Sequence, residues 1–141
     1  MNLPRRAALS LALLPFAALA SEDALTAAIR AEIGTATPQE GGITLRVPAV
    51  AENGGQVPVT VLVDSPQNAE RHVTAIHLFA TRNPTPGIAS FKLGPALARA
   101  EIQTRIRMAE NQMLVVVAQM NDGSVRRASA EIRVATGGCL T

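Results

Sequence analysis

The stretch VPVTVLV at residues 57–63 decides the fold class of this 141-residue chain. Valine stands at every second position, and successive side chains of a β-strand point to opposite faces, so one face of this strand is apolar. Pro58 has no amide proton, which predicts that the strand lies partly at the edge of a sheet. Residues 43–47 alternate in the same way, and the turn-forming cluster at residues 52–55 divides the two strands.

The same two-residue period continues to the end of the chain. Residues 72–80 are apolar on both faces, as in a central strand, and residues 88–93 form a shorter strand. Residues 100–108 have one apolar and one polar face, and residues 113–120 are again apolar. The hairpin signal at residues 121–124 leads into a return strand, which we expect to bury Ala128, Ala130, Ile132 and Val134. About seven strands predict an all-β fold, an immunoglobulin-like antiparallel β-sandwich.

The first twenty residues have the pattern of an export signal. Arg5 and Arg6 precede a short apolar run, and a small-x-small cleavage site ends at Ala20. The paired arginines favour the twin-arginine route over general secretion. We therefore expect residues 1–20 to be removed and the mature protein to work in a periplasm, as a short helix plus β-sandwich over residues 21–136 with a flexible tail at residues 137–141.

A short helix is predicted over residues 21–33. Ser21 can cap it, Glu22 and Asp23 suit its positive N-terminal end, and Gly34 can stop it. One face is apolar, so the helix is expected to pack against the body; the residues are Leu25, Ala28, Ile29 and Ile33. Residues 35–42 are expected to be a linker.

Charge and composition exclude several function classes. Without the two arginines of the leader, the mature chain has eleven basic and eleven acidic residues, which gives no electrostatic reason to bind nucleic acid or anionic lipid. The chain has three phenylalanines and no tryptophan or tyrosine, so a surface that stacks against sugars or bases is not expected. No arrangement typical of an autonomous enzyme, of a bound cofactor or of a zinc site is visible in the sequence.

The candidate site is the end of the chain, where Cys139 follows Gly137 and Gly138. Cys139 is the only cysteine, and an unpaired cysteine in an exported protein implies an intermolecular bond or a reactive thiol. Two glycines would let the thiol swing as an arm. The alternative is a frayed terminus with an incidental thiol.

Several motifs together resemble the SoxY family, the sulfur-carrier subunit of the periplasmic thiosulfate-oxidising system. These motifs occur in order over the whole mature chain: Ala51-Glu52-Asn53-Gly54 before Val57-Pro58, Asn83-Pro84 with Pro86 and Phe91, Thr104-Arg105-Ile106-Arg107, Asp122-Gly123-Ser124, and the terminal Gly-Gly-Cys. The terminal motif is the most specific of them.

The resemblance implies a carrier rather than an enzyme. It implies that Cys139 holds sulfur intermediates covalently, with Gly137 and Gly138 as the flexible arm. It also implies a heterodimer with a SoxZ-like subunit, and visits to a haem-containing conjugating enzyme, a thiosulfohydrolase and a sulfur dehydrogenase. The family usually ends Gly-Gly-Cys-Gly-Gly, whereas Leu140 and Thr141 follow the cysteine here.

Other candidate residues have less specific patterns. His72 and His77 lie five apart on one strand and therefore point to opposite faces, which favours structural roles over a shared metal. Met108, Met113 and Met120 raise a copper-handling alternative, but their spacing favours core packing. Arg105 and Arg107 share a polar strand face that is either simply solvated or contacts a partner or an oxyanion. A sulfur carrier is thus favoured, ahead of a periplasmic interaction module with an incidental thiol and of a copper-handling protein.

Overall fold

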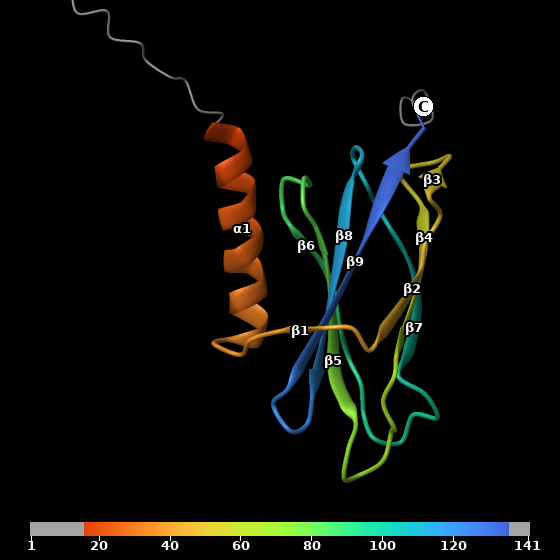
Figure 1. The fold of residues 1–141 in the computed structure, drawn as a ribbon. Coiled ribbons are helices and arrows are strands. Elements are labelled where there is room, and N and C mark those ends of the chain that lie inside the picture. The colour runs from red at the N-terminus through yellow and green to blue at the C-terminus, as the bar shows by residue number, and fades with distance from the viewer. Residues whose placement is uncertain (1–15, 136–141) are drawn as a thin grey trace, which may run out of the picture.

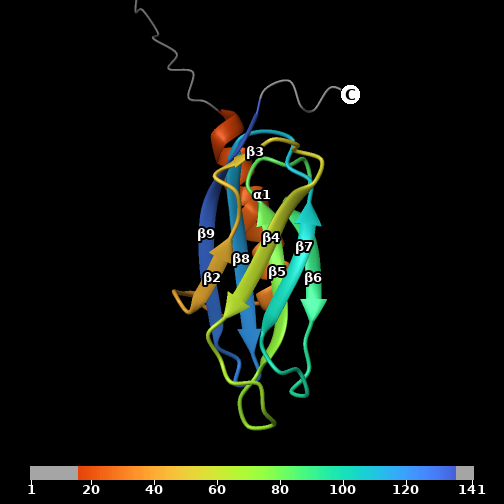
Figure 2. The ribbon, with the colours of Figure 1, turned by 90° about the vertical axis from the view of Figure 1, so that its right-hand side faces the viewer.

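The structure, a computed structural model, describes residues 16–135 and has three layers. A helix covers one face of a six-stranded sheet, and a three-stranded sheet covers the other face (Figures 1 and 2). The predicted β-sandwich is therefore confirmed, with the helix added as a third layer on its outside.

Helix α1 runs over Phe16–Ile33 and so begins five residues earlier than the sequence predicted. Residues 16–20 are four strong or moderate helix formers and a phenylalanine, with no capping residue or proline among them, so nothing stops the helix before Ser21. Ser21 consequently lies inside the helix and is not its cap. Within residues 16–135, no helix combines the length and apolarity needed to cross a membrane.

The larger sheet has the strand order β1-β9-β8-β5-β6, and β3 also pairs with β9. Its long strands are β5 (Val73–Ala80), β6 (Gly87–Lys92), β8 (Gln112–Met120) and β9 (Val125–Val134), which pair antiparallel. Strand β5 lies between β6 and β8, which confirms its prediction as an internal strand.

The smaller sheet consists of β2 (Ile43–Arg46), β4 (Val57–Val63) and β7 (Glu101–Ile106), in the order β2-β4-β7. Strand β4 is central, but β2 pairs with it only from Thr60 to Val63. Pro58 therefore has a strand on one side only, β7, where it lies opposite Arg105. The missing amide proton of Pro58 thus costs no ladder hydrogen bond, as the sequence predicted for a partial edge.

Two short strands were not predicted, β1 (Gln39–Glu40) and β3 (Val50–Ala51). Both pair parallel with β9, β1 near its start and β3 near its end. Two-residue strands leave no hydrophobic period in a sequence, and residues 39–40 had therefore been included in a linker.

The apolar core has two parts, one on each face of the larger sheet. Between the sheets, the alternate valines of β4 pack against apolar side chains of β5 and β8. Under the helix, Ile29 and Ile33 pack on Phe79, Val115 and Val117. Burying an aliphatic side chain of this size stabilises by about 1.5–3 kcal/mol, so the helix is held by its two isoleucines, with Leu25 and Ala28 partly buried beside them.

The last strand is less buried than expected. Ile132 is fully buried, but Ala128, Ala130 and Val134 are only half-buried. The reason is that the smaller sheet has three strands against six, and β2 is its main contact with β9. Strand β9 therefore lies where the cover of the smaller sheet ends.

The hairpin between β8 and β9 has the predicted turn. Gly123 has a φ of 88°, a conformation that glycine adopts without strain. The Ser124 hydroxyl and amide both donate to Asp122 Oδ1, at 2.6 and 2.9 Å, and the hydroxyl bond is the main reason that the pKa of Asp122 is lowered. This turn lies at the end of the sandwich opposite the end of β9 (Figure 1).

We expect the core between the sheets to dominate stability. Leu78 of β5 is fully buried, so Leu78→Ala should lower the free energy of unfolding by about 2–5 kcal/mol, measured by urea denaturation. Leu97 is 45% exposed, and Leu97→Ala is the matched control, with an expected change within about 0.5 kcal/mol. Equal effects of the two substitutions would contradict the burial described above.

Candidate functional site

The predicted site residues, Gly137, Gly138 and Cys139, lie outside the described residues. The structure instead shows how the chain is held just before them, along the last part of β9 and at Ala135. We call residues 133–135 the tail root. It lies at the end of the sandwich that also carries β3 and the start of β8 (Figure 1).

On one side, the tail root is hydrogen-bonded to the segment that contains β3. Arg133 N donates to Ala49 O at 3.0 Å, and Ala135 N donates to Ala51 O at 2.9 Å. This pairing is parallel, with Val50 opposite Arg133 and Ala51 opposite Val134. Strand β3 therefore holds the chain one residue beyond the end of β9.

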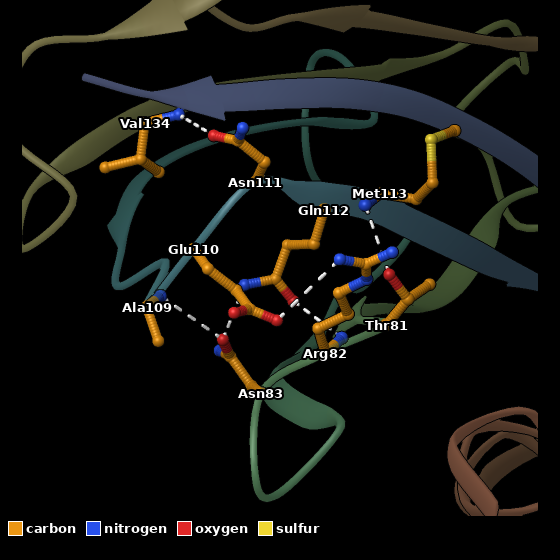
Figure 3. A network of polar contacts seen from close by, with 9 residues as sticks. All are labelled: Thr81, Arg82, Asn83, Ala109, Glu110, Asn111, Gln112, Met113 and Val134. Atoms are coloured by element: carbon orange, nitrogen blue, oxygen red, sulfur yellow. Dashed lines mark hydrogen bonds and ion pairs between the residues drawn. The ribbon is translucent and has the colours of Figure 1, made fainter. Parts of the chain in front are cut away.

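On the other side, a side chain takes the place of a neighbouring strand as the hydrogen-bond partner of the tail root. The ladder between β8 and β9 ends where Gln112 lies opposite Ile132. Beyond it, Val134 N donates to Asn111 Oδ1 at 2.7 Å (Figure 3). Asn111 thus supplies the acceptor that a longer β8 would have supplied, and the tail root is hydrogen-bonded on both sides.

A buried amide supports this end of the sandwich. Gln112 is only 4% exposed, and both ends of its side chain are bonded. Its Oε1 accepts from Arg82 N, and its Nε2 donates to Asn83 Oδ1, both at 2.7 Å (Figure 3). Gln112 therefore fixes the start of β8 to the loop that follows β5.

Asn83 extends this network to the smaller sheet. Its Nδ2 donates to Arg107 O at 3.1 Å, and its Oδ1 accepts from Ala109 N at 3.4 Å. Thr81 and Met113 bond each other twice: Thr81 N donates to Met113 O, and Met113 N donates to Thr81 Oγ1, both at 3.1 Å. Three segments are thus joined at the end of the sandwich from which the tail continues.

The charges around the tail root are mixed. Arg82 Nη1 lies 4.0 Å from Glu110 Oε1, and Arg133 Nε lies 3.5 Å from Glu131 Oε1. All four side chains are more than half exposed, so each pair contributes at most about 1 kcal/mol. This end of the sandwich therefore carries both positive and negative charges rather than an electrostatic potential of one sign.

Arg105 and Arg107 are both exposed, as the sequence predicted for a polar face. Arg105 Nη1 donates weakly to Gln56 Oε1 at 3.4 Å. Arg107 lies just beyond β7, and its carbonyl takes part in the Asn83 network. Their contact with a partner or an oxyanion stays a prediction.

The two histidines have different surroundings, and His77 has a structural role. Its Nδ1 lies 2.7 Å from Ser90 Oγ and 3.5 Å from Glu32 Oε2, and its Nε2 lies 2.7 Å from Gln119 Oε1. His77 is buried beneath α1 and links the helix to β6 and β8. His72 is half-buried and its Nδ1 lies 2.9 Å from Asn68 O.

Two of the three candidate methionines belong to the core. Met108 and Met120 are buried between the sheets, as predicted, whereas Met113 is 36% exposed on β8. The core prediction was therefore wrong for Met113, whose side chain points to the opposite face from Leu114. Within the described part of the chain, no group of three or more His, Asp or Glu residues could hold a metal ion.

Sequence reasoning missed the residues that hold the tail root, Asn111 and Gln112, and the bridging Asn83. In the sequence, Asn83 stands out only as part of the Asn83-Pro84 motif. The available signal was two adjacent amide residues directly before an apolar strand, where a buried amide needs partners. Those partners lie on other segments, so only the fold identifies them.

Comparison with known proteins extends these observations. The family model described as sulfur oxidation protein SoxY matches residues 29–139. No match is found among curated proteins.

Among solved structures, the sulfur carrier protein SoxY from Chlorobium limicola f thiosulfatophilum is similar, with 37% sequence identity and a TM-score of 0.68. That match covers 81% of this chain and 98% of the other. A superoxide reductase (neelaredoxin) from Ignicoccus hospitalis has 17% identity and a TM-score of 0.59, covering 67% of this chain and 81% of that one.

A putative superoxide reductase from Thermotoga maritima has 14% identity and a TM-score of 0.60, and covers 70% of this chain and 94% of the other. At such identities these two reductases share the fold alone with this chain. The SoxY match is of a different kind, because it combines the family model over most of the chain with a structure that is more than one third identical. The chain belongs to the SoxY family of sulfur oxidation proteins.

Proposed function

We propose that this protein is a sulfur carrier that holds thiosulfate-derived groups covalently on Cys139 and presents them to separate enzymes. The observation that carries the proposal is the extent of the family match, which reaches residue 139 and so includes the only thiol of the chain. The carrier itself would need no cofactor, since the chemistry belongs to its partners.

The tail root supports this role because it is held on both sides. Ala51 O and Asn111 Oδ1 fix the backbone at Ala135 and Val134. Cys139 follows four residues later, and at about 3.3–3.6 Å per extended residue it stays within about 14 Å of Ala135. A fixed root and a short glycine-containing arm give the thiol a defined region to search.

The proposed chemistry balances if the partners supply the redox step. Joining the Cys139 thiolate to the outer sulfur of thiosulfate forms one S–S bond and releases two electrons, which a haem-containing conjugating enzyme would accept. A thiosulfohydrolase would then add water, release sulfate and two protons, and leave a persulfide on Cys139. A sulfur dehydrogenase would then oxidise the outer persulfide sulfur with three waters, take up six electrons, release six protons and leave a sulfonate on the Cys139 sulfur. A second hydrolysis would add one more water, release sulfate and two protons, and restore the Cys139 thiolate.

The tail departs from the usual family ending. A free thiol has a pKa of about 8.5, and no basic residue neighbours Cys139 in the sequence, so activation would occur inside partner sites. Leu140 is bulkier than glycine and should narrow the set of channels that accept the tail. The location follows from the leader: we propose that residues 1–20 direct export to the periplasm.

We also propose a stable heterodimer with a SoxZ-like β-sandwich. In the described part of the chain, β6, β7 and β2 each pair on one side only, as do the short strands β1 and β3, so both sheets have edges to be covered or blunted. Lys92 is the only lysine of the chain, so the usual lysine protection of edges is nearly absent. The apolar content of β5, in contrast, needs no partner, because α1 covers its second face.

Replacing the thiol should abolish carriage without unfolding the protein. Cys139→Ser should show no sulfur adduct by intact-mass spectrometry and no thiosulfate oxidation in a reconstituted system, with a melting temperature within about 2 °C of the original, because chain ends contribute little burial. Leu140→Gly, which keeps the thiol, is the control and should still be loaded. Retained oxidation by Cys139→Ser would overturn the carrier proposal.

Removing the acceptor at the tail root should loosen it. Asn111→Leu leaves the Val134 amide without its 2.7 Å partner, so the hydrogen exchange of this amide should speed up and the free energy of unfolding should fall by about 0.5–1.5 kcal/mol, because the bond is exposed to water. Asn111→Asp keeps an acceptor oxygen and is the matched control. Unchanged exchange at Val134 in the leucine variant would show that β3 alone fixes the tail root.

The heterodimer should form without the thiol. Co-expressing Cys139→Ser with a SoxZ-like chain should give one peak for both chains in size-exclusion chromatography at micromolar concentration, since the contact is between sheet edges and is not a disulfide. Separate elution of the two chains would contradict the heterodimer and would mean that this chain protects its own sheet edges.

A further inference from the structure

The exposed apolar side chains are distributed unevenly over the protein. Among the residues whose side chains the structure describes, three large hydrophobic residues are exposed: Val50, Leu97 and Met113. A single exposed hydrophobic residue is ordinary. Two of these three, however, lie beside the tail root, whereas Leu97 lies in the loop between β6 and β7 at the opposite end (Figure 2).

Val50 and Met113 flank β9 and point to the same face of the larger sheet. Val50 pairs with Arg133 on one side of β9, and Met113 pairs with Glu131 on its other side. Paired residues share a face, and residues two apart on a strand share a face as well. This is the face that α1 covers further along β8, at Val115 and Val117.

A groove continues this face between α1 and the end of the sheet. It has a volume of about 470 Å³ and is lined by Glu22 and Leu25 of the helix, by Thr81 and Arg82, and by β8 and β9. Met113 and Asn111 both line it, and Asn111 is the residue that holds Val134. One residue, Asn111, therefore both lines the groove and is hydrogen-bonded to the tail root.

The short distance in sequence between Ala135 and Cys139 means that a protein that reacts with Cys139 must come close to this surface. Cys139 lies within about 14 Å of Ala135, so any protein that reacts with its sulfur comes at least that close to the tail root. A standard interface buries about 800 Å² per partner, which corresponds to a circular patch with a radius of about 16 Å. A patch of that size centred on the tail root includes Val50, which pairs with Arg133, and Met113, which pairs with Glu131 two residues before it. It also includes the start of the groove, because Asn111 lines the groove and is hydrogen-bonded to Val134.

We infer that Val50, Met113 and the adjoining groove form the docking surface for the enzymes that act on Cys139. This inference rests on the proposed function and adds the contact that the carrier makes outside its arm. The occupant is an apolar protrusion of the enzyme beside the entrance to its active site. Methionine suits such a surface, because its unbranched side chain adapts to partners of different shape.

The charges of this surface predict how the contact responds to salt. Arg82 and Arg133 lie among Glu22, Glu110 and Glu131, and two of these acids are already paired with the arginines. With both signs present, long-range attraction is weak, and the contact depends on apolar burial. Raising the ionic strength from 0.05 to 0.5 M is therefore expected to change the docking affinity less than about threefold.

The test uses polar substitutions that keep the shape of each side chain. Val50→Thr combined with Met113→Gln removes the apolar contact, and Leu97→Gln at the far end is the matched control. Loading of Cys139 by the purified haem-containing conjugating enzyme with thiosulfate is followed by intact-mass spectrometry over a range of carrier concentrations. Alkylation of Cys139 by iodoacetamide, which needs no docking, is measured for the same proteins.

We expect the double variant to lose about tenfold in kcat/KM for loading, through a higher KM with kcat nearly unchanged, because the contact is made equally before and during reaction. Leu97→Gln should stay within twofold, and the alkylation rates of all variants should be equal. Equal kcat/KM for the double variant and the original protein would overturn the docking surface while leaving the carrier function in place.

Two further outcomes also decide the matter. Faster alkylation in the double variant would mean that the tail itself occupies the groove, which overturns the inference. Absence of loading in the original protein would overturn the proposed function, and the docking surface with it.

Discussion

The fold depends on the need to bury both faces of the larger sheet. Strands β5 and β8 carry apolar side chains on successive positions, for example Leu78 with Phe79 and Val116 with Val117, and these point to opposite faces. One layer cannot cover both faces. The smaller sheet covers one and α1 covers the other, so the helix is part of the core rather than an appendage.

This arrangement explains why side chains hold the tail root. The smaller sheet is narrower than the larger one, so β9 lies near the limit of its cover, and on its inner face Ile132 is buried whereas Ala128, Ala130 and Val134 are half-buried. Beyond Ile132, packing alone therefore holds the chain weakly. Asn111 and the backbone of residues 49–51 supply hydrogen bonds there instead, and Gln112 and Asn83 fix the segments from which those bonds come.

The long elements were predictable from the sequence because each has its own period. Alternation located β4 and β7, and the hairpin residues located the turn before β9. The two short strands and the early start of α1 were not predictable, because β1 and β3 exist only through pairing with β9 and residues 16–20 carry no signal that stops a helix. Cys139, the proposed attachment site, stands out in the sequence because it is the only cysteine, whereas the amides at the tail root depend on partners more than twenty residues away in sequence.

The proposed function also bears on how tightly a partner needs to bind. In that proposal, an enzyme that binds the surface around the tail root has Cys139 within about 14 Å of Ala135, so the effective concentration of the thiol at that surface reaches the millimolar range. A weak apolar contact is then sufficient for reaction. Weak contact also suits the proposed role, in which the carrier visits several enzymes in turn, because each complex has to dissociate before the next one forms. Two exposed apolar side chains beside a hydrogen-bonded root fit this requirement better than a large permanent interface would.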